Sequence, residues 1–212
     1  MHEEKYYWDF LKAYILGKFP ESQFFSDEQI VSKGRDEDLK LYHFKRKEIL
    51  PRVHHVIGML KSMFPATLLD VGSGRGTFLW PLLEALPDLE VTSIDLNEDA
   101  IRVCQDVHAG GMRRLRGRLM DARSLDFDSG SFDGVTLLEV LEHMENPEDA
   151  VAEACRVSRS FVIVSVPSKP DDNPEHIHLF DQEMIRSMFA RCSVRNIRFE
   201  HIREHMIAMV TK

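Results

Sequence analysis

From residue 67 onward, short apolar runs alternate with amphipathic segments, and this rhythm restricts the fold more than any other feature of the chain. The pattern predicts strands at residues 67–71, 90–94, 114–120, 132–138 and 161–166. Helices are predicted between them, at residues 78–86, 98–107, 147–157 and 182–189. A parallel connection needs a dozen or more residues and is usually helical. We therefore expect a doubly wound α/β domain, with a mostly parallel sheet between two layers of helices.

The two ends of the chain depart from this alternation. Residues 194–202 and 206–210 resemble consecutive strands without a helix between them, which predicts an antiparallel pair at one edge of the sheet. Before residue 65, an apolar stripe runs from Leu39 to Leu60 at intervals of three and four residues, as in one helix bent at Pro51. We expect residues 1–64 to form a helical cap, or lid, on a domain of residues 65–212.

Composition excludes several classes of protein. The 212 residues are 43% hydrophobic and 29% charged, which suits one folded domain with an appendage. The net charge of −8 argues against a general nucleic-acid binder. No apolar run is long enough for a membrane span, the amino terminus is acidic, and the three cysteines show no CxxC spacing. These features predict a cytoplasmic protein without a membrane partner and leave its oligomeric state unknown.

The most informative stretch follows the first predicted strand, at residues 70–76 (Asp-Val-Gly-Ser-Gly-Arg-Gly). Glycines let a backbone turn sharply and approach a ligand closely. A dinucleotide-binding loop would continue as GxGxxG, but counting from Gly72 the third glycine position is Thr77. A carboxylate at Asp70 would repel a pyrophosphate and attract a cationic ligand. The turn therefore favours a positively charged nucleoside over a dinucleotide.

Two further acidic residues follow the next two predicted strands. Asp95 comes nineteen residues after Gly76, where a carboxylate can accept hydrogen bonds from both hydroxyls of a ribose. Asp121 follows the third strand and could accept a hydrogen bond from an adenine amino group, or simply begin a surface turn. Ligands of such sheets bind at the carboxyl ends of the strands, so the three carboxylates are expected to lie around one nucleoside.

As an ordered set, the motifs of residues 66–166 resemble those of the class I S-adenosylmethionine-dependent methyltransferases. The resemblance rests on five segments: residues 70–76, Ser93-Ile94-Asp95, Met120-Asp121-Ala122, residues 131–135 (Ser-Phe-Asp-Gly-Val) and residues 138–143 (Leu-Glu-Val-Leu-Glu-His). It implies a Rossmann-like sheet of seven strands with an antiparallel C-terminal edge strand, and S-adenosyl-L-methionine as cofactor. It also implies that the segment before the first motif covers the substrate.

The resemblance assigns roles to particular residues. Gly72 and Gly74 would lie under the methionine part of the cofactor, beside Asp70. Asp95 and Leu96 would hold the ribose, and Asp121 and Ala122 the adenine. Glu139 would line the cleft.

The methyl acceptor is expected near the ends of the fourth and fifth strands. There His143 or His178 could act as a base or orienting group, since an imidazole titrates near neutrality. Methyl transfer can also proceed by alignment alone. We expect no metal for a small-molecule methyltransferase. Glu139, Glu142 and His143 are nevertheless spaced as on one side of a helical turn, and with His178 they could hold a divalent metal in an RNA-methylating alternative.

Three functions remain open at this stage. The first is a methyltransferase that acts on a small molecule. The second is a metal-dependent RNA 3′-terminal 2′-O-methyltransferase. The spacing of Glu139, Glu142, His143 and His178 resembles the metal-binding motif of that family, but the acidic net charge of the chain disfavours RNA as substrate. The third is a non-catalytic regulatory module that binds S-adenosylmethionine.

Overall fold

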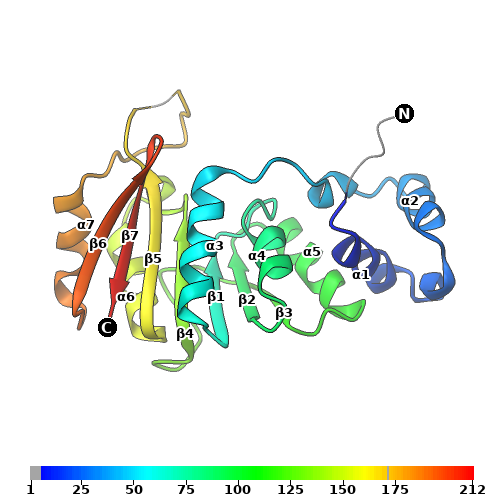
Figure 1. Ribbon diagram of the computed structural model, residues 1–212, viewed down its shortest axis with the longest axis horizontal. Helices are drawn as coiled ribbons and strands as arrows, with labels where there is room; N and C mark the ends of the chain where they lie inside the picture. Colours follow the sequence, from blue (N-terminus) through cyan, green and yellow to red (C-terminus); the bar gives the residue numbers. More distant parts are fainter. Residues whose placement is uncertain (1–5, 171) are drawn as a thin grey trace.

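A seven-stranded sheet forms the centre of the molecule (Figure 1). The computed structural model describes residues 6–170 and 172–212. The strands are β1 (Thr67–Val71), β2 (Glu90–Asp95), β3 (Leu115–Leu119), β4 (Phe132–Leu138), β5 (Ser158–Pro167), β6 (Asn196–Ile202) and β7 (His205–Thr211). Their order across the sheet is β3-β2-β1-β4-β5-β7-β6. The doubly wound, mostly parallel fold predicted from the alternation is confirmed.

The last strand runs against its neighbours. β7 pairs antiparallel with β5 on one side and with β6 on the other. The other strand pairs, from β3 across to β5, are parallel. The expected antiparallel C-terminal pair is therefore present, with β7 inside the sheet and β6 at its edge.

Helices pack on both faces of the sheet, and strand side chains alternate between two buried cores. Leu68 and Ile163 belong to the core under one set of helices, whereas Leu69 and Val164 belong to the other. The long helices are α1 (Trp8–Lys18), α2 (Asp27–Asp36), α3 (Pro51–Met63), α4 (Leu79–Ala85), α5 (Glu98–Ala109), α6 (Pro147–Val157) and α7 (Gln182–Met188). Short 3₁₀ turns lie at Pro20–Phe24, Leu41–Phe44, Leu141–His143 and Phe189–Arg191.

The segment before β1 differs from the single bent helix that the apolar stripe predicts. Residues 41–44 form a 3₁₀ turn, the chain then runs without regular structure, and α3 begins at Pro51. Proline is favoured in the first helical turn because its missing N–H has no helical partner there. Pro51 therefore starts a helix instead of bending one.

The two parts of the N-terminal segment lie in different places (Figure 1). α1 packs along α5, far from β5 and β7, and α2 lies beyond it. α3 packs on the sheet face itself and shares a core with Leu68 and Ile207. Within the described residues, no helix is both long enough and apolar enough to cross a membrane.

Candidate functional site

The site lies where the strand order reverses. β1 is followed along the chain by β2 and β3 on one side, whereas β4 and β5 lie on its other side. Ligands of doubly wound sheets bind at the carboxyl ends of the strands beside such a reversal. A cavity of about 690 Å³ opens there, within the size range of cofactor sites.

The cavity brings together most of the residues expected from the strand ends. Its walls contain Gly72, Gly74, Asp95, Leu96, Asp121, Ala122, Glu139 and His143. The rest of the lining is one further charged residue, Glu175, and the apolar residues Val71, Ile94, Met120, Val140 and Met144. Such a mixture of apolar surface and a few polar groups suits an aromatic base carried on a sugar.

The glycine turn after β1 keeps its backbone close to the cavity. Gly72 and Gly74 have φ angles of 76° and 48°, in the left-handed region that favours glycine. A Cβ added at Gly74 would have no protein atom within 4 Å, so the space beside it is open. The Gly74 amide donates a hydrogen bond of 2.8 Å to Asp95 Oδ2, which ties the turn to the end of β2.

Asp95 is oriented by backbone amides. Its Oδ1 accepts a hydrogen bond of 2.8 Å from the Asn97 amide, while Oδ2 accepts from Gly74. Each carboxylate oxygen has two lone pairs, so both can still accept from a vicinal diol.

The sequence leaves open whether Asp121 accepts from an adenine amino group or begins a turn, and in the structure its carboxylate is hydrogen-bonded to Arg123. The Arg123 side chain donates to both of its oxygens, at 2.7 Å from Nη2 and 3.1 Å from Nε. These hydrogen bonds lower the pKa of Asp121. Its carboxylate therefore stays ionised at the cavity wall, with Arg123 as its partner in this structure.

Asp70 lies beside the large cavity, in the wall of a smaller one of about 270 Å³ that also contains Gly72, Gly74 and Glu139. Asp70 is 3% exposed, and its Oδ1 accepts a hydrogen bond of 2.9 Å from the Thr136 hydroxyl. Its Oδ2 is buried and has no hydrogen-bond donor among the described residues. Burial, and to a lesser degree the negative charge of Asp95, raises the pKa of Asp70 to about 7. A buried acceptor without a donor fits a cationic group of a ligand.

Glu139 joins the two cavities. It follows β4 with a φ of 57°, uncommon for a residue with a side chain. Its carboxylate contacts the Ser165 hydroxyl at 2.6 Å, His205 Nε2 at 2.9 Å and, at 3.6 Å, Arg52 Nε of α3. Glu139 therefore does not share a helical turn with Glu142 and His143, because the 3₁₀ turn begins only at Leu141.

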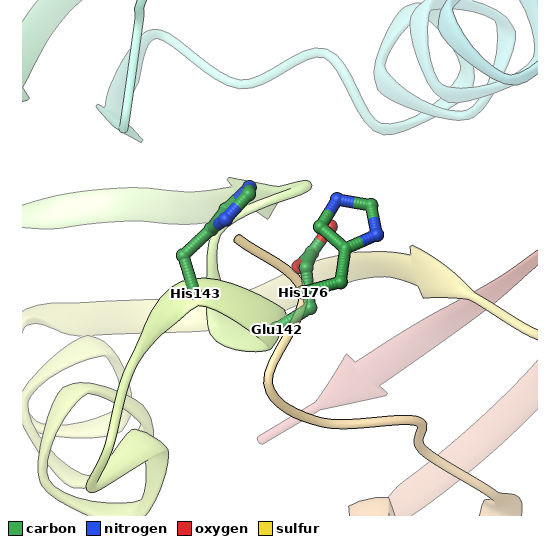
Figure 2. Close-up of side chains that lie close together, drawn as sticks. All are labelled: Glu142, His143 and His176. Carbon is green, nitrogen blue, oxygen red and sulfur yellow. The ribbon is translucent and has the colours of Figure 1, made fainter. Parts of the chain in front are cut away.

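A second group of side chains lies beside the large cavity, which one of them, His143, lines, and Figure 2 shows the three side chains together. Glu142 and His143 come from the turn after β4, and His176 comes from the loop after β5. One ligand atom from each of these three lies within 4.8 Å of the others. Two imidazoles and a buried carboxylate are a donor set that suits a divalent transition metal.

This group is not the one expected from the spacing. His176 takes the place of His178, whose ring packs against Phe180 at a centroid distance of 5.5 Å. Glu139 is directed into the contacts with Ser165 and His205. Sequence reasoning also missed Arg52 and His205, since their positions depend on where α3 packs and on the pairing of Pro167 with His205.

The fold is that of a doubly wound α/β domain with a cavity of cofactor size at the strand reversal. Comparison with known proteins makes the class specific: residues 69–163 match the family described as "Methyltransferase domain". This region is therefore a class I S-adenosylmethionine-dependent methyltransferase domain, with S-adenosylmethionine as its cofactor. The oriented carboxylate of Asp95 has the chemistry to accept from the sugar of that cofactor, and Asp70 Oδ2, which has no donor among residues 6–170 and 172–212, has the chemistry to receive its ammonium group.

Two curated relatives are named as O-methyltransferases. The chain is 29% identical over 120 residues to malonyl-[acyl-carrier protein] O-methyltransferase of Geobacter sulfurreducens, a match covering 57% of this chain and 44% of the relative. It is 34% identical over 108 residues to ubiquinone biosynthesis O-methyltransferase of Alkalilimnicola ehrlichii, covering 50% and 42%. The chain thus matches less than half the length of either relative.

Among solved structures, magnesium protoporphyrin IX methyltransferase from Synechocystis PCC 6803 has a similar fold. The TM-score is 0.61 at 17% identity, and the match covers 76% of this chain and 82% of that one. At this identity the likeness concerns the fold alone.

Proposed function

We propose that this chain transfers the methyl group of S-adenosylmethionine to an oxygen atom of a small organic acceptor. One observation carries the proposal: a cavity of about 690 Å³ at the strand reversal, framed by the glycine turn and by the oriented carboxylate of Asp95. The relatives that are named as O-methyltransferases support oxygen as the acceptor atom.

The cofactor supplies an electrophilic methyl group on a sulfonium centre. The protein would hold the cofactor and align the acceptor with its methyl group. Asp95 would accept from the ribose hydroxyls, Asp70 would receive the ammonium group, and Gly74 would leave room for the methionine tail. Glu139 and His143 would face the acceptor from the end of β4, since both line the cavity.

Calorimetry with S-adenosylmethionine tests this assignment directly. We expect Asp95→Ala to weaken binding by about 100-fold or more, because two hydrogen bonds to a charged group are lost. Asp99→Ala is the matched control, since Asp99 is exposed and pairs with Lys40 on the surface. Equal affinities of the wild type and Asp95→Ala would contradict the proposal. Once cofactor binding through Asp95 is established, a screen of phenols and carboxylic acids with labelled cofactor would identify the acceptor.

Metal-dependent methylation of RNA stays an alternative prediction. It would have to use Glu142, His143 and His176, because these are the residues that the structure groups. Loss of RNA methylation with a chelator, and its return with Mn²⁺, would support that alternative. A regulatory module would bind the cofactor and methylate no acceptor in the screen.

The cellular location also stays a proposal. Cys104, Cys155 and Cys192 are free thiols, which fits the reducing cytoplasm.

A further inference from the structure

The side chain of Glu139 makes more contacts than a residue that only lines a cavity would need. Its backbone occupies the left-handed region, where strain persists only when the surroundings enforce it. The surroundings here are three side chains from three elements: Ser165 of β5, His205 of β7 and Arg52 of α3. The carboxylate is therefore fixed in position and in orientation.

The contact with His205 has the geometry of a carboxylate that orients an imidazole. His205 Nε2 lies 2.9 Å from Glu139 Oε2. In the neutral ring, Nε2–H donates to the carboxylate and Nδ1 keeps its lone pair. Burial lowers the pKa of His205, and the charge of Arg52 acts in the same direction, whereas Glu139 raises it. A neutral imidazole oriented by a carboxylate is the arrangement of a general base.

His205 also lies beside an opening of its own. A groove of about 420 Å³ runs between the start of α3 and the turn from β6 to β7. His205 and Ile202 line it on one side, and Leu50 and Arg52 on the other. Leu50 and Arg52 also line the smaller cavity that contains Asp70 and Glu139. The pair of Glu139 and His205 thus stands between the cofactor cavity and a second route to the surface.

We propose that the methyl acceptor is a hydroxyl compound that enters by this groove, and that His205, oriented by Glu139, takes its proton. This inference rests on the proposed function. The acceptor oxygen forms a bond to the methyl carbon while the carbon–sulfur bond breaks and leaves its electron pair on sulfur. The hydroxyl proton passes to Nδ1 of His205 and then to water. His205 is in this account a catalytic residue, and Ser165 and Arg52 are positioning residues.

Two acceptors that differ in ionisation separate a base from a structural residue. Catechol keeps its hydroxyl protons at pH 8, whereas 4-nitrocatechol is largely ionised and needs no base. We expect His205→Asn to lower kcat on catechol by about 100-fold or more. The loss on 4-nitrocatechol should be far smaller, and the affinity for S-adenosylhomocysteine in calorimetry should not change. His205→Gln serves as a second variant, and His201→Asn, on the exposed side of the same hairpin, is the matched control.

Several outcomes would overturn the inference. Equal slowing of both catechols by His205→Asn would show that the residue only supports the structure. If the wild type methylates carboxylic acids but neither catechol, a hydroxyl acceptor at this site is excluded. The same holds if the wild type binds the cofactor but methylates none of these compounds. The proposed function fails separately, when the wild type binds no S-adenosylmethionine.

Discussion

At the scale of single residues, two aspartates at neighbouring strand ends occupy opposite environments. Asp95 is half-buried, and each of its two carboxylate oxygens accepts a hydrogen bond from a backbone amide. Asp70 is buried, and one of its oxygens has no donor among the described residues. Its pKa of about 7 follows from that burial. The same residue type thus provides a carboxylate bonded to two amides at one strand and a buried carboxyl group with a raised pKa at the next.

The raised pKa of Asp70 makes cofactor binding depend on pH. Below about pH 7 the free protein holds Asp70 protonated, and an ammonium group binds the ionised form. We expect affinity for S-adenosylmethionine to fall as the pH is lowered from 8 to 6. Asp70→Asn should bind about 10- to 100-fold more weakly at pH 8, because a hydrogen bond to a charged group is lost, and should vary little over this range. Calorimetry at several pH values measures both effects.

The raised pKa of Asp70 also determines how the free energy of unfolding changes with pH. Because its pKa is higher in the folded than in the unfolded chain, Asp70 stabilises the fold when protonated. That contribution is lost as the pH rises from about 4 through about 7. Denaturant unfolding of Asp70→Asn should therefore show less loss of stability over this window than the wild type. The exposed Asp126→Asn should follow the wild type, and identical slopes for Asp70→Asn would contradict the prediction.

The strand ends made much of the lining of the large cavity predictable. Gly72, Gly74, Asp95 and Asp121 each follow a strand in the chain, so local periodicity already assigns them to one edge of the sheet. Arg52 and His205 carry no such signal. Arg52 reaches the site because α3 packs on the sheet, and His205 because β7 pairs with β5 in one particular register.

At the scale of elements, local patterns predicted the kind of each element better than its limits. β5 begins at Ser158, three residues before the apolar run at Phe161. The helix before β1 begins at Pro51, although its apolar stripe starts earlier. Apolar residues at helical intervals also occur in a short 3₁₀ turn, as the buried Leu41 and Phe44 show.

The turn between β1 and α4 offers a matched pair of glycines. Gly74 and Gly76 both have positive φ angles, of 48° and 78°. A Cβ at Gly74 would meet open space, whereas one at Gly76 would overlap the ring of Trp80. We expect Gly74→Ala to cost about 1 kcal/mol of stability and to weaken cofactor binding, because the methyl group projects toward the cavity.

Gly76→Ala should cost about 2 kcal/mol or more, since overpacking adds to the backbone strain. Thermal unfolding and calorimetry distinguish the two variants. Equal stability of the two would show that Trp80 can move aside.

At the scale of the whole molecule, the N-terminal helices belong to the same core as the sheet. Leu11 and Ile15 of α1, Trp80 of α4 and Leu68 of β1 lie in one continuous buried cluster. α1 lies against α5, on the side of the sheet away from β5 and β7. We propose that α3 covers the site while α1 and α2 support the fold from a distance, in place of one lid over residues 1–64.

Leu11→Ala tests this division of roles. Leu11 is fully buried, so its truncation should lower the free energy of unfolding by about 2–5 kcal/mol. Cofactor affinity should stay the same at temperatures where the variant is folded. A single unfolding transition is expected because the cluster is continuous. A large loss of affinity without a loss of stability would instead assign α1 to a lid.

The reversed direction of β7 has an evolutionary consequence. The parallel strands present their last residues at the edge that binds the ligand, but β7 presents its first residue, His205, and with it the turn from Ile202 to His205. In the proposed entry route, a longer or altered hairpin tip would change the groove while the glycine turn and Asp95 stay as they are. On that proposal, a descendant of this chain could change its acceptor through substitutions at these four residues, because none of them lines the large cavity at the strand reversal.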